Sequence, residues 1–171
     1  MIRYVLIPLD GSQFAEKALP IARQVLETGG HITLMTALPG QSSQIYYPTD
    51  ETMDEVEDHT EVLHAAKPQA QDYMERIAQK LRLQGYVVDI HIVVGDPAAA
   101  IVQTAEGLRT DMIVISTHGR SGLSRFLFGS VTLKVLSESA IPVLVVPSRE
   151  REEAEEPAPA SAPDTGPSLA I

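Results

Sequence analysis

Short apolar runs alternate with helix-like segments along most of this chain, and that alternation constrains its fold more than any other feature. The apolar runs lie at residues 2–7, 31–37, 87–94, 111–116 and 142–147. Each has the length and the β-favouring composition of a buried strand. Strands that alternate with helices predict an α/β domain whose parallel sheet is covered on both faces. Right-handed crossovers make such a sheet doubly wound.

The first segment between strands is expected to form one bent helix. Ser12 is a favourable N-cap residue, and apolar residues repeat at helical spacing over residues 15–26. Gly29-Gly30 then supplies a stop signal. Pro20 lies inside the segment, where a proline bends a helix at a cost of about 3 kcal/mol.

Three further helices are predicted from periodicity and capping signals. Residues 54–84 have helical periodicity, with a break expected at Pro68. Asp96-Pro97 combines an N-cap residue with a proline at the first helical position, so a helix over residues 98–108 is expected to follow. The last helix is expected over about residues 130–139, after a glycine-containing loop.

The C-terminal segment differs in composition from the rest of the chain. Residues 149–171 contain six acidic residues, two arginines and four prolines. Such a segment cannot bury enough apolar surface to offset its ordering entropy, so we expect it to be disordered. Residues 1–148 hold most of the hydrophobic residues and are long enough for a single domain with its own core.

The charge and the first residues argue against several classes of protein. The formal net charge is −10, whereas a nucleic-acid-binding protein carries a basic face. The start, MIRYVLIPLDG, has no basic leader followed by an apolar stretch of signal length, and no uncharged run reaches the length of a membrane span. We therefore expect a cytoplasmic protein that binds no nucleic acid and inserts into no membrane. Five histidines in no ligand pattern, without any cysteine, argue against a structural metal site.

Two strand ends carry the residues best suited to bind a ligand. Leu9-Asp10-Gly11-Ser12 follows the first strand, and Ser116-Thr117-His118-Gly119 follows the fourth. Nine residues separate Gly119 from Gly129-Ser130, where the last helix is expected to begin. Free N–H groups and the helix dipole at such a start suit phosphate oxygens, and glycine permits close approach of the backbone to a ligand.

Structural explanations compete with these functional ones. Residues 10–12 alone are an ordinary strand-to-helix turn with a cap; beside the second loop we favour a ligand role, with Asp10 reaching a ribose hydroxyl or a phosphate-bound Mg²⁺. His118 is interpreted as a residue that orders the loop, because no nucleophile or partner acid accompanies it. Arg120 and Arg125 are consistent both with phosphate binding and with ordinary solvated charges.

Three stretches together make residues 1–147 resemble the universal stress proteins. They are VLIPLDGSQFAEKAL near the start, VVGDPAAAIV at the end of the third strand, and ISTHGRSGLSRFLFGSVTLKVL before PVLVVP. The nucleotide-binding pattern of that family is Gly, two residues, Gly, nine residues, Gly, then Ser or Thr. Gly119, Gly129 and Ser130 match it, whereas Ser116 replaces the first glycine.

The resemblance implies the strand order 3-2-1-4-5, which would bring both candidate loops to one site. It also implies bound ATP with Mg²⁺ or Mn²⁺, for which Asp10 is a candidate metal ligand. The residues expected at the nucleotide are Pro8, Leu9, Asp10, Gly11, Ser12, Ala37, Gly95, Ser116, His118, Gly119, Arg120, Gly129, Ser130 and Val131. A homodimer joined through residues 142–147, an apolar strand at the sheet edge in that order, is implied as well.

The leading hypothesis is an ATP-binding regulatory or stress-response module without fast turnover. The sequence has no GxxxxGK[ST] motif, so it offers no lysine placed for the β- and γ-phosphates in that manner. Two alternatives stay open. One is a slow ATPase or nucleotidyl-transfer enzyme; the other is an interaction protein with a vestigial nucleotide site, which Ser116 permits. The leading hypothesis leaves room for a protein partner, which the sequence does not identify.

Overall fold

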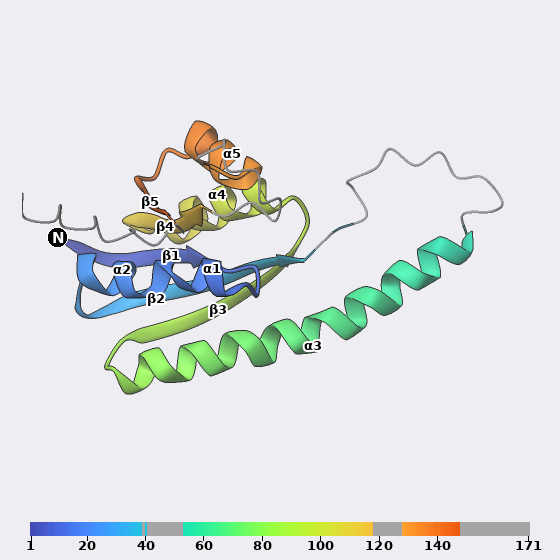
Figure 1. Cartoon of the computed structure of the whole chain (residues 1–171), viewed down its shortest axis with the longest axis horizontal. Coiled ribbons are helices and arrows are strands. Elements are labelled where there is room, and N and C mark those ends of the chain that lie inside the picture. The colour runs from blue at the N-terminus through green and yellow to red at the C-terminus, as the bar shows by residue number, and fades with distance from the viewer. Residues whose placement is uncertain (39, 41–52, 118–127, 148–171) are drawn as a thin grey trace, which may run out of the picture.

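A five-stranded parallel sheet forms the centre of the molecule (Figure 1). The structure is a computed structural model that describes residues 1–38, 40, 53–117 and 128–147, and for 53–64 the backbone alone. The sheet order is β3-β2-β1-β4-β5, so the predicted doubly wound topology is confirmed. The strands are β1 (Ile2–Pro8), β2 (Leu26–Leu38), β3 (Val87–Val94), β4 (Met112–Thr117) and β5 (Val143–Pro147).

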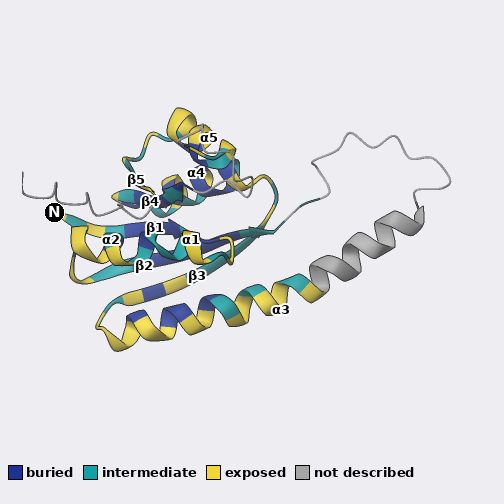
Figure 2. Ribbon diagram, in the orientation of Figure 1, coloured by how far each residue is buried: buried dark blue, intermediate teal, exposed yellow. Residues whose placement is uncertain are grey.

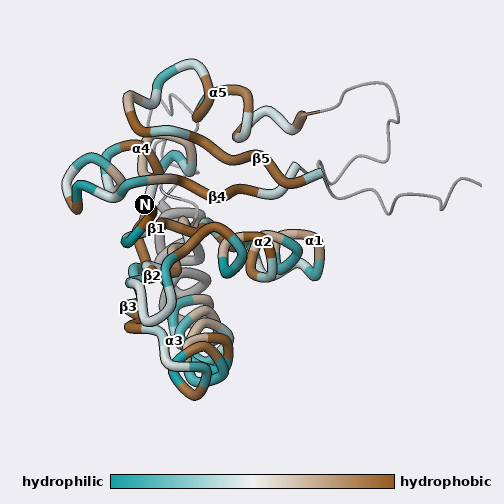
Figure 3. The backbone as a smooth tube through the Cα atoms, turned by 90° about the vertical axis from the view of Figure 1, so that its left-hand side faces the viewer, coloured by the Kyte–Doolittle hydropathy of each residue, from teal (hydrophilic) through white to brown (hydrophobic). Residues whose placement is uncertain are grey.

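Helices cover both faces of this sheet, as predicted (Figure 1). One face carries α1 (Gln13–Glu16), α2 (Ala18–Val25) and α3 (Met53–Leu83); the other carries α4 (Pro97–Leu108) and α5 (Ser130–Glu138). Successive strand residues point to opposite faces, so Val5 and Ile7 of β1 join the core under α1–α3, whereas Leu6 joins the core under α4 and α5. Figure 2 shows buried residues mainly along the central strands, and Figure 3 shows β1, β4 and β5 as largely hydrophobic.

The first helical segment is split rather than merely bent. The break falls at Lys17, between α1 and α2, where the Lys17 N–H donates to the Phe14 carbonyl at 3.1 Å. Pro20 explains the position, because its ring crowds the carbonyl four residues earlier and it offers no N–H to that carbonyl. That carbonyl belongs to Glu16, the last residue of α1.

The expected helix end at the two glycines is wrong. The helix α2 ends at Val25, and Leu26 already pairs with Ile2 as the first residue of β2. The pairing register between β1 and β2 shifts directly afterwards. Gly29 has a φ of +77°, and a Cβ on Gly30 would lie 2.8 Å from the Leu26 side chain. The glycines therefore permit the tight path of the chain inside β2 instead of capping a helix.

The expected break at Pro68 is also wrong. The helix α3 runs without interruption from Met53 to Leu83, with Pro68 inside it. A proline removes one backbone hydrogen bond and crowds the carbonyl four residues before it. Pro68 is exposed, so water can solvate that carbonyl. The helix α3 projects beyond the sheet (Figure 1).

The remaining elements lie close to their predicted bounds. The Asp96 side chain caps α4 by accepting the Ala99 N–H at 2.8 Å, with Pro97 at the first helical position. The strands β4 and β5 begin one residue later than expected. No helix within the described residues is long and apolar enough to cross a membrane. The acidic segment 149–171 lies outside the described residues.

Candidate functional site

The ends of β1 and β4 meet where the strand order of the sheet reverses. β1 pairs with β2 on one side and with β4 on the other. The chain leaves β1 toward α1 on one face and leaves β4 toward α5 on the opposite face. Ligands of doubly wound sheets bind at such a switch point, beyond the carboxyl ends of the strands. We call this part of the molecule the switch-point edge; it comprises Pro8–Ser12, Ser116 and Gly129–Val131.

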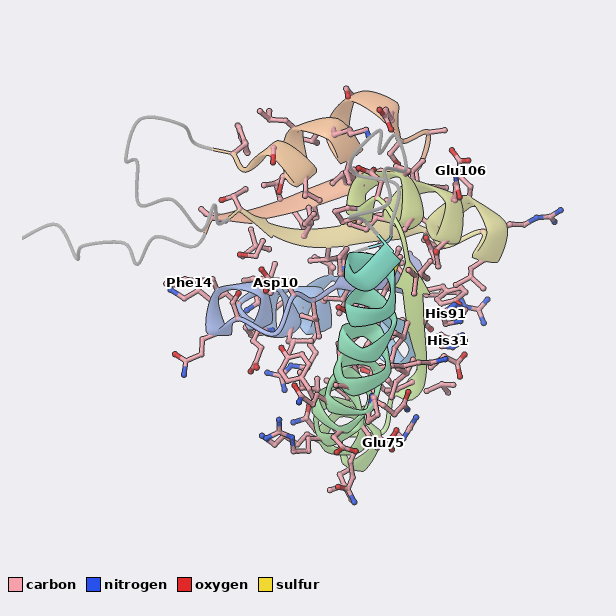
Figure 4. All side chains as sticks on the ribbon, turned by 90° about the vertical axis from the view of Figure 1, so that its right-hand side faces the viewer. Asp10, Phe14, His31, Glu75, His91 and Glu106 are labelled. Atoms are coloured by element: carbon pink, nitrogen blue, oxygen red, sulfur yellow. The ribbon has the colours of Figure 1, made fainter. Side chains whose placement is uncertain are left out.

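The loop after β1 is held in one conformation by its own side chains. One carboxylate oxygen of Asp10, Oδ1, accepts the Ser12 N–H at 2.9 Å and the Ser12 hydroxyl at 2.6 Å. The Ser12 oxygen in turn accepts the Ala15 N–H at 3.2 Å and caps α1. Gly11 supplies the φ of +82° that the turn requires. Asp10 is exposed, so its carboxylate stands in solvent at the edge (Figure 4).

The loop after β1 is also hydrogen-bonded to the neighbouring strand β2. Pro8 is its last residue, and the N–H of the buried Leu9 donates to the Met35 carbonyl of β2 at 2.7 Å. The paired residues of β1 and β2 continue as far as Pro8 and Met35, whereas those of β1 and β4 are Val5 with Met112 and Leu6 with Ile113. The loop is therefore fixed to β2, and β4 ends beside it without a continuing ladder to β1.

The N-cap residue of α5 has no side chain, and no side chain among the described residues is seen to cap the first turn. Gly129 is the N-cap residue and makes no capping bond, in contrast to Ser12 before α1 and Asp96 before α4. Ser130 is exposed as the first helical residue, and Val131 is half-buried against the core. The first N–H groups of a helix lack partners inside the helix and carry part of its positive dipole. An anion is therefore favoured at this helix start.

Ser116 contributes a buried hydroxyl to the same edge. Its Oγ is buried and finds no hydrogen-bond partner among the described residues. A buried polar group without a partner costs on the order of 1–3 kcal/mol. A ligand oxygen or a water at the end of β4 would satisfy this hydroxyl. The residue that departs from the glycine pattern thus brings a polar atom to the site as well as extra volume.

The ends of β2 and β3 are packed closely beside this edge. Ala37 pairs with Val93, and the Gly95 N–H donates to the Leu38 carbonyl at 2.9 Å. Gly95 has a φ of +145°, a conformation available chiefly to glycine. Ala37 and Gly95 therefore lie at the same edge of the sheet as Asp10, one and two strands further from β4.

Some predicted site residues lie outside the described part of the chain. These are His118, Gly119 and Arg120, together with Arg125. Their place at the nucleotide stays a prediction. No group of three or more His, Asp or Glu side chains suited to hold a metal ion is found among the described residues, so a metal at Asp10 would depend on oxygens that the ligand supplies.

Lys134 of α5 was not among the site residues predicted from the sequence. The Lys134 ammonium lies 3.1 Å from Asp96 Oδ1 and so links α5 to the N-cap of α4. Spacing gives one local signal, because Lys134 lies four residues after Ser130 on the same helix face. Its contact with Asp96 joins residues 38 positions apart. That pairing depends on how α4 and α5 pack and has no local sequence signal.

A hollow that the described residues form lies elsewhere. It has a volume of about 650 Å³, and its lining comes from α3 alone, by Gln69, Asp72, Glu75, Arg76 and Gln79. A depression along one exposed helix, lined by charged and amide side chains, offers few converging groups. The switch-point edge, where several elements converge, is the better candidate.

Comparison with known proteins identifies the family. The model of the universal stress protein family matches residues 1–147. Universal stress protein MJ0577 of Methanocaldococcus jannaschii is 42% identical over 78 residues, which cover 46% of this chain and 48% of that protein. Universal stress protein MJ0531 of the same organism is 26% identical over 152 residues, covering 89% and 86%. The aligned segment is thus about half of the first relative and most of the second.

Solved structures agree with this fold. The structure of MJ0577 covers 88% of this chain and 99% of its own, with 30% identity and a TM-score of 0.74. A universal stress protein family protein from Arabidopsis thaliana with AMP bound covers 91% and 97%, at 18% identity and a TM-score of 0.60. A universal stress protein in complex with cAMP covers 86% and 98%, at 22% identity and a TM-score of 0.54. Because the family model spans residues 1–147, nearly all of the sheet and its helices, the chain belongs to the universal stress protein family.

Proposed function

We propose that this protein is a regulatory module that binds an adenine nucleotide, ATP above all, at the switch-point edge. The observation that carries the proposal is the start of α5 at Gly129, which lies at the same carboxyl edge of the sheet as the Asp10–Ser12 loop. One offers free N–H groups to phosphate, and the other offers an exposed carboxylate. In this proposal the Asp10 carboxylate accepts from a ribose hydroxyl or binds a Mg²⁺ or Mn²⁺ ion that the phosphates carry.

The structural neighbours support the class of ligand. Two proteins that share this fold hold AMP and cAMP, as described above. Their identity with this chain is low, so they support a nucleotide in this fold and not the contacts of particular residues. The assignment of ATP rests on the Gly119, Gly129 and Ser130 pattern together with the geometry at α5.

The same site argues for slow turnover or none. Fast phosphoryl transfer needs charges and a base positioned around the γ-phosphate. The sequence has no GxxxxGK[ST] loop, and the Asp10 carboxylate is engaged by Ser12. We therefore favour a nucleotide that sets conformation or partner choice in a cytoplasmic regulator over one that is consumed. Turnover at tens per second by the purified protein, lost on changing the site, would favour the enzyme instead.

The proposal is tested by calorimetric titration of ATP with Mg²⁺ into the parent protein and into Gly129→Val. Gly129 has φ −69° and ψ 158°, which valine readily adopts, so the fold should persist. The valine side chain would stand between the α5 backbone and the phosphates, and we expect binding to weaken by tenfold or more, about 1.4 kcal/mol.

Gly107→Ala is the matched control. A Cβ at this α4 position meets no atom within 4 Å, and the change should leave ATP affinity unaltered. A parent protein that binds neither ATP, ADP nor AMP at millimolar concentration refutes the proposed function and supports a vestigial site.

A further inference from the structure

An ion pair connects the two helices that cover the α4–α5 face of the sheet. The Lys134 ammonium donates to Asp96 Oδ1 at 3.1 Å, and both side chains are about half exposed, 46% and 52%. Lys134 is the sole basic residue in the sequence of α4 and α5. The one cation of this helical layer is thus paired with the carboxylate that caps the neighbouring helix.

The ion pair lies at the carboxyl edge of the sheet. Asp96 follows Gly95 directly at the end of β3 and accepts the Ala99 N–H at the start of α4. Lys134 is in the second turn of α5, about 6 Å along the axis from Ser130 at a rise of 1.5 Å per residue. Helix side chains tilt toward the N-terminus of their helix, and the ammonium reaches the residue that caps α4. The ammonium therefore lies near the starts of both helices.

The chemistry at this place favours an anion. Two helix starts supply positive dipole ends, and the N-cap residue of α5, Gly129, offers no side chain to cap it. A lysine ammonium has three N–H donors, and the hydrogen bond to Asp96 uses one of them. The hydrogen bond from Lys134 to Asp96 raises the pKa of Lys134, so the ammonium stays charged at neutral pH. The pKa of Asp96 is lowered, chiefly by the Ala99 N–H, so the pair is ionised.

We propose that Lys134 is a ligand-contact residue for the phosphates of the bound nucleotide, and that Asp96 competes with the phosphates for its ammonium. The inference rests on the proposed function and deepens it, because it assigns a phosphate-binding role to a residue outside the glycine pattern. Asp96 thereby lowers the affinity of the site for phosphate while it holds the lysine at the edge.

The experiment is calorimetric titration of ATP with Mg²⁺, and separately of adenosine, into the parent, Lys134→Gln and Asp96→Asn. Asparagine caps helices as well as aspartate does, so Asp96→Asn retains the start of α4 and removes the charge. Lys80→Gln is the control for loss of one positive charge; Lys80 is exposed in the last turn of α3, at the opposite edge of the sheet. A melting curve of each variant reports its fold.

Lys134→Gln is expected to weaken ATP binding about tenfold, the size of one hydrogen bond between charged groups, and to leave adenosine binding unchanged. Asp96→Asn is expected to tighten ATP binding a few-fold, and Lys80→Gln to change neither. Equal losses for ATP and adenosine in Lys134→Gln, or no loss at all, would overturn the assignment and leave the pair as a tie between helices. Weaker ATP binding in Asp96→Asn would overturn the competition. If the parent protein binds no nucleotide, the proposed function itself is refuted. The titration of ATP into the parent distinguishes this outcome from a failure of the Lys134 assignment alone.

Discussion

At the scale of single residues, the departure from the family pattern has a physical consequence inside this molecule. Ser116 stands where the pattern has glycine, and its Oγ is buried without a partner among the described residues. By contrast Ser139, at the other end of α5, donates to the Ile141 carbonyl at 2.9 Å and accepts the Ile141 N–H at 3.1 Å. The Ser139 hydroxyl has hydrogen-bond partners and the Ser116 hydroxyl has none among the described residues, so removing each hydroxyl should have a different effect on stability.

Ser116→Ala is expected to stabilise the ligand-free protein, because it removes a buried hydroxyl that finds no partner among the described residues and it retains the Cβ. A gain of about 1 kcal/mol corresponds to a rise in Tm of about 2–4 °C for a chain of this size. Thermal unfolding followed by circular dichroism measures it. The same substitution at Ser139 removes a partnered hydroxyl and should lower Tm. A fall in Tm for Ser116→Ala as large as that for Ser139→Ala would show that the Ser116 hydroxyl has a partner.

At the scale of elements, one carboxylate joins the starts of β1 and β4. Asp111 Oδ2 accepts the N–H groups of Arg3 and Tyr4 at 2.7 and 2.9 Å, and its own N–H donates to the Tyr4 carbonyl at 2.8 Å. These bonds lower the pKa of Asp111, that from Arg3 most. These hydrogen bonds hold the start of β4 against the start of β1. The opposite ends of the same two strands lie at the switch-point edge.

Asp111→Ala is expected to lower the free energy of unfolding by about 1–2 kcal/mol at neutral pH, because two backbone donors lose a charged acceptor. The folded-state pKa lies below the unfolded value near 3.8. The contribution is therefore complete above about pH 4 and is lost as the pH falls through the folded pKa. Urea unfolding at pH 7 and pH 3 should show the parent and variant converging at the lower pH. Glu106→Ala, which removes an exposed carboxylate from α4, is the control; a pH-independent difference for Asp111→Ala would contradict the linkage.

At the scale of the whole molecule, the sheet ends at β5 on one side and at β3 on the other. The side chains of Val143, Leu144 and Val145 are half-buried, and Figure 3 shows β5 as strongly hydrophobic. An apolar edge strand offers unpaired N–H and C=O groups to another chain. The prolines at 142 and 147 limit such pairing to a short register. We therefore propose a homodimer formed through β5.

Val145→Lys is expected to convert a dimeric parent to a monomer, because a charge at the β5 edge would be desolvated in the interface. Light scattering at micromolar concentration measures the mass, and circular dichroism confirms that the variant is folded. Val87→Lys places the same charge on the edge strand β3, where Val87 is 56% exposed, and should leave the mass unchanged. A monomeric parent, or a Val145→Lys variant that remains fully dimeric, refutes the β5 interface.

The sequence by itself determined the elements and their local ends. Hydrophobic periodicity, capping residues and turn residues influence the backbone within a few positions along the chain. For this reason β3, the Asp96 cap of α4 and the start of α5 were predicted correctly. The topology followed once the resemblance supplied the strand order. The tertiary structure decided what depends on distant contacts or on solvent. Leu26 became a strand residue because it pairs with Ile2, and Pro68 stayed inside α3 because it is exposed.

The same division holds at the candidate site. Asp10, Gly129 and Ser130 were found from spacing because strand ends and helix starts have local signatures. No such signature marked the burial of the Ser116 hydroxyl away from any partner in the described part of the chain, the bonds of Asp111 to β1, or the Lys134–Asp96 pair. Each depends on which groups of other elements surround a side chain in the folded molecule. Hydrogen bonding and ion pairing across elements follow from packing geometry, and that geometry is set by the assembled sheet and helices rather than by neighbours along the chain.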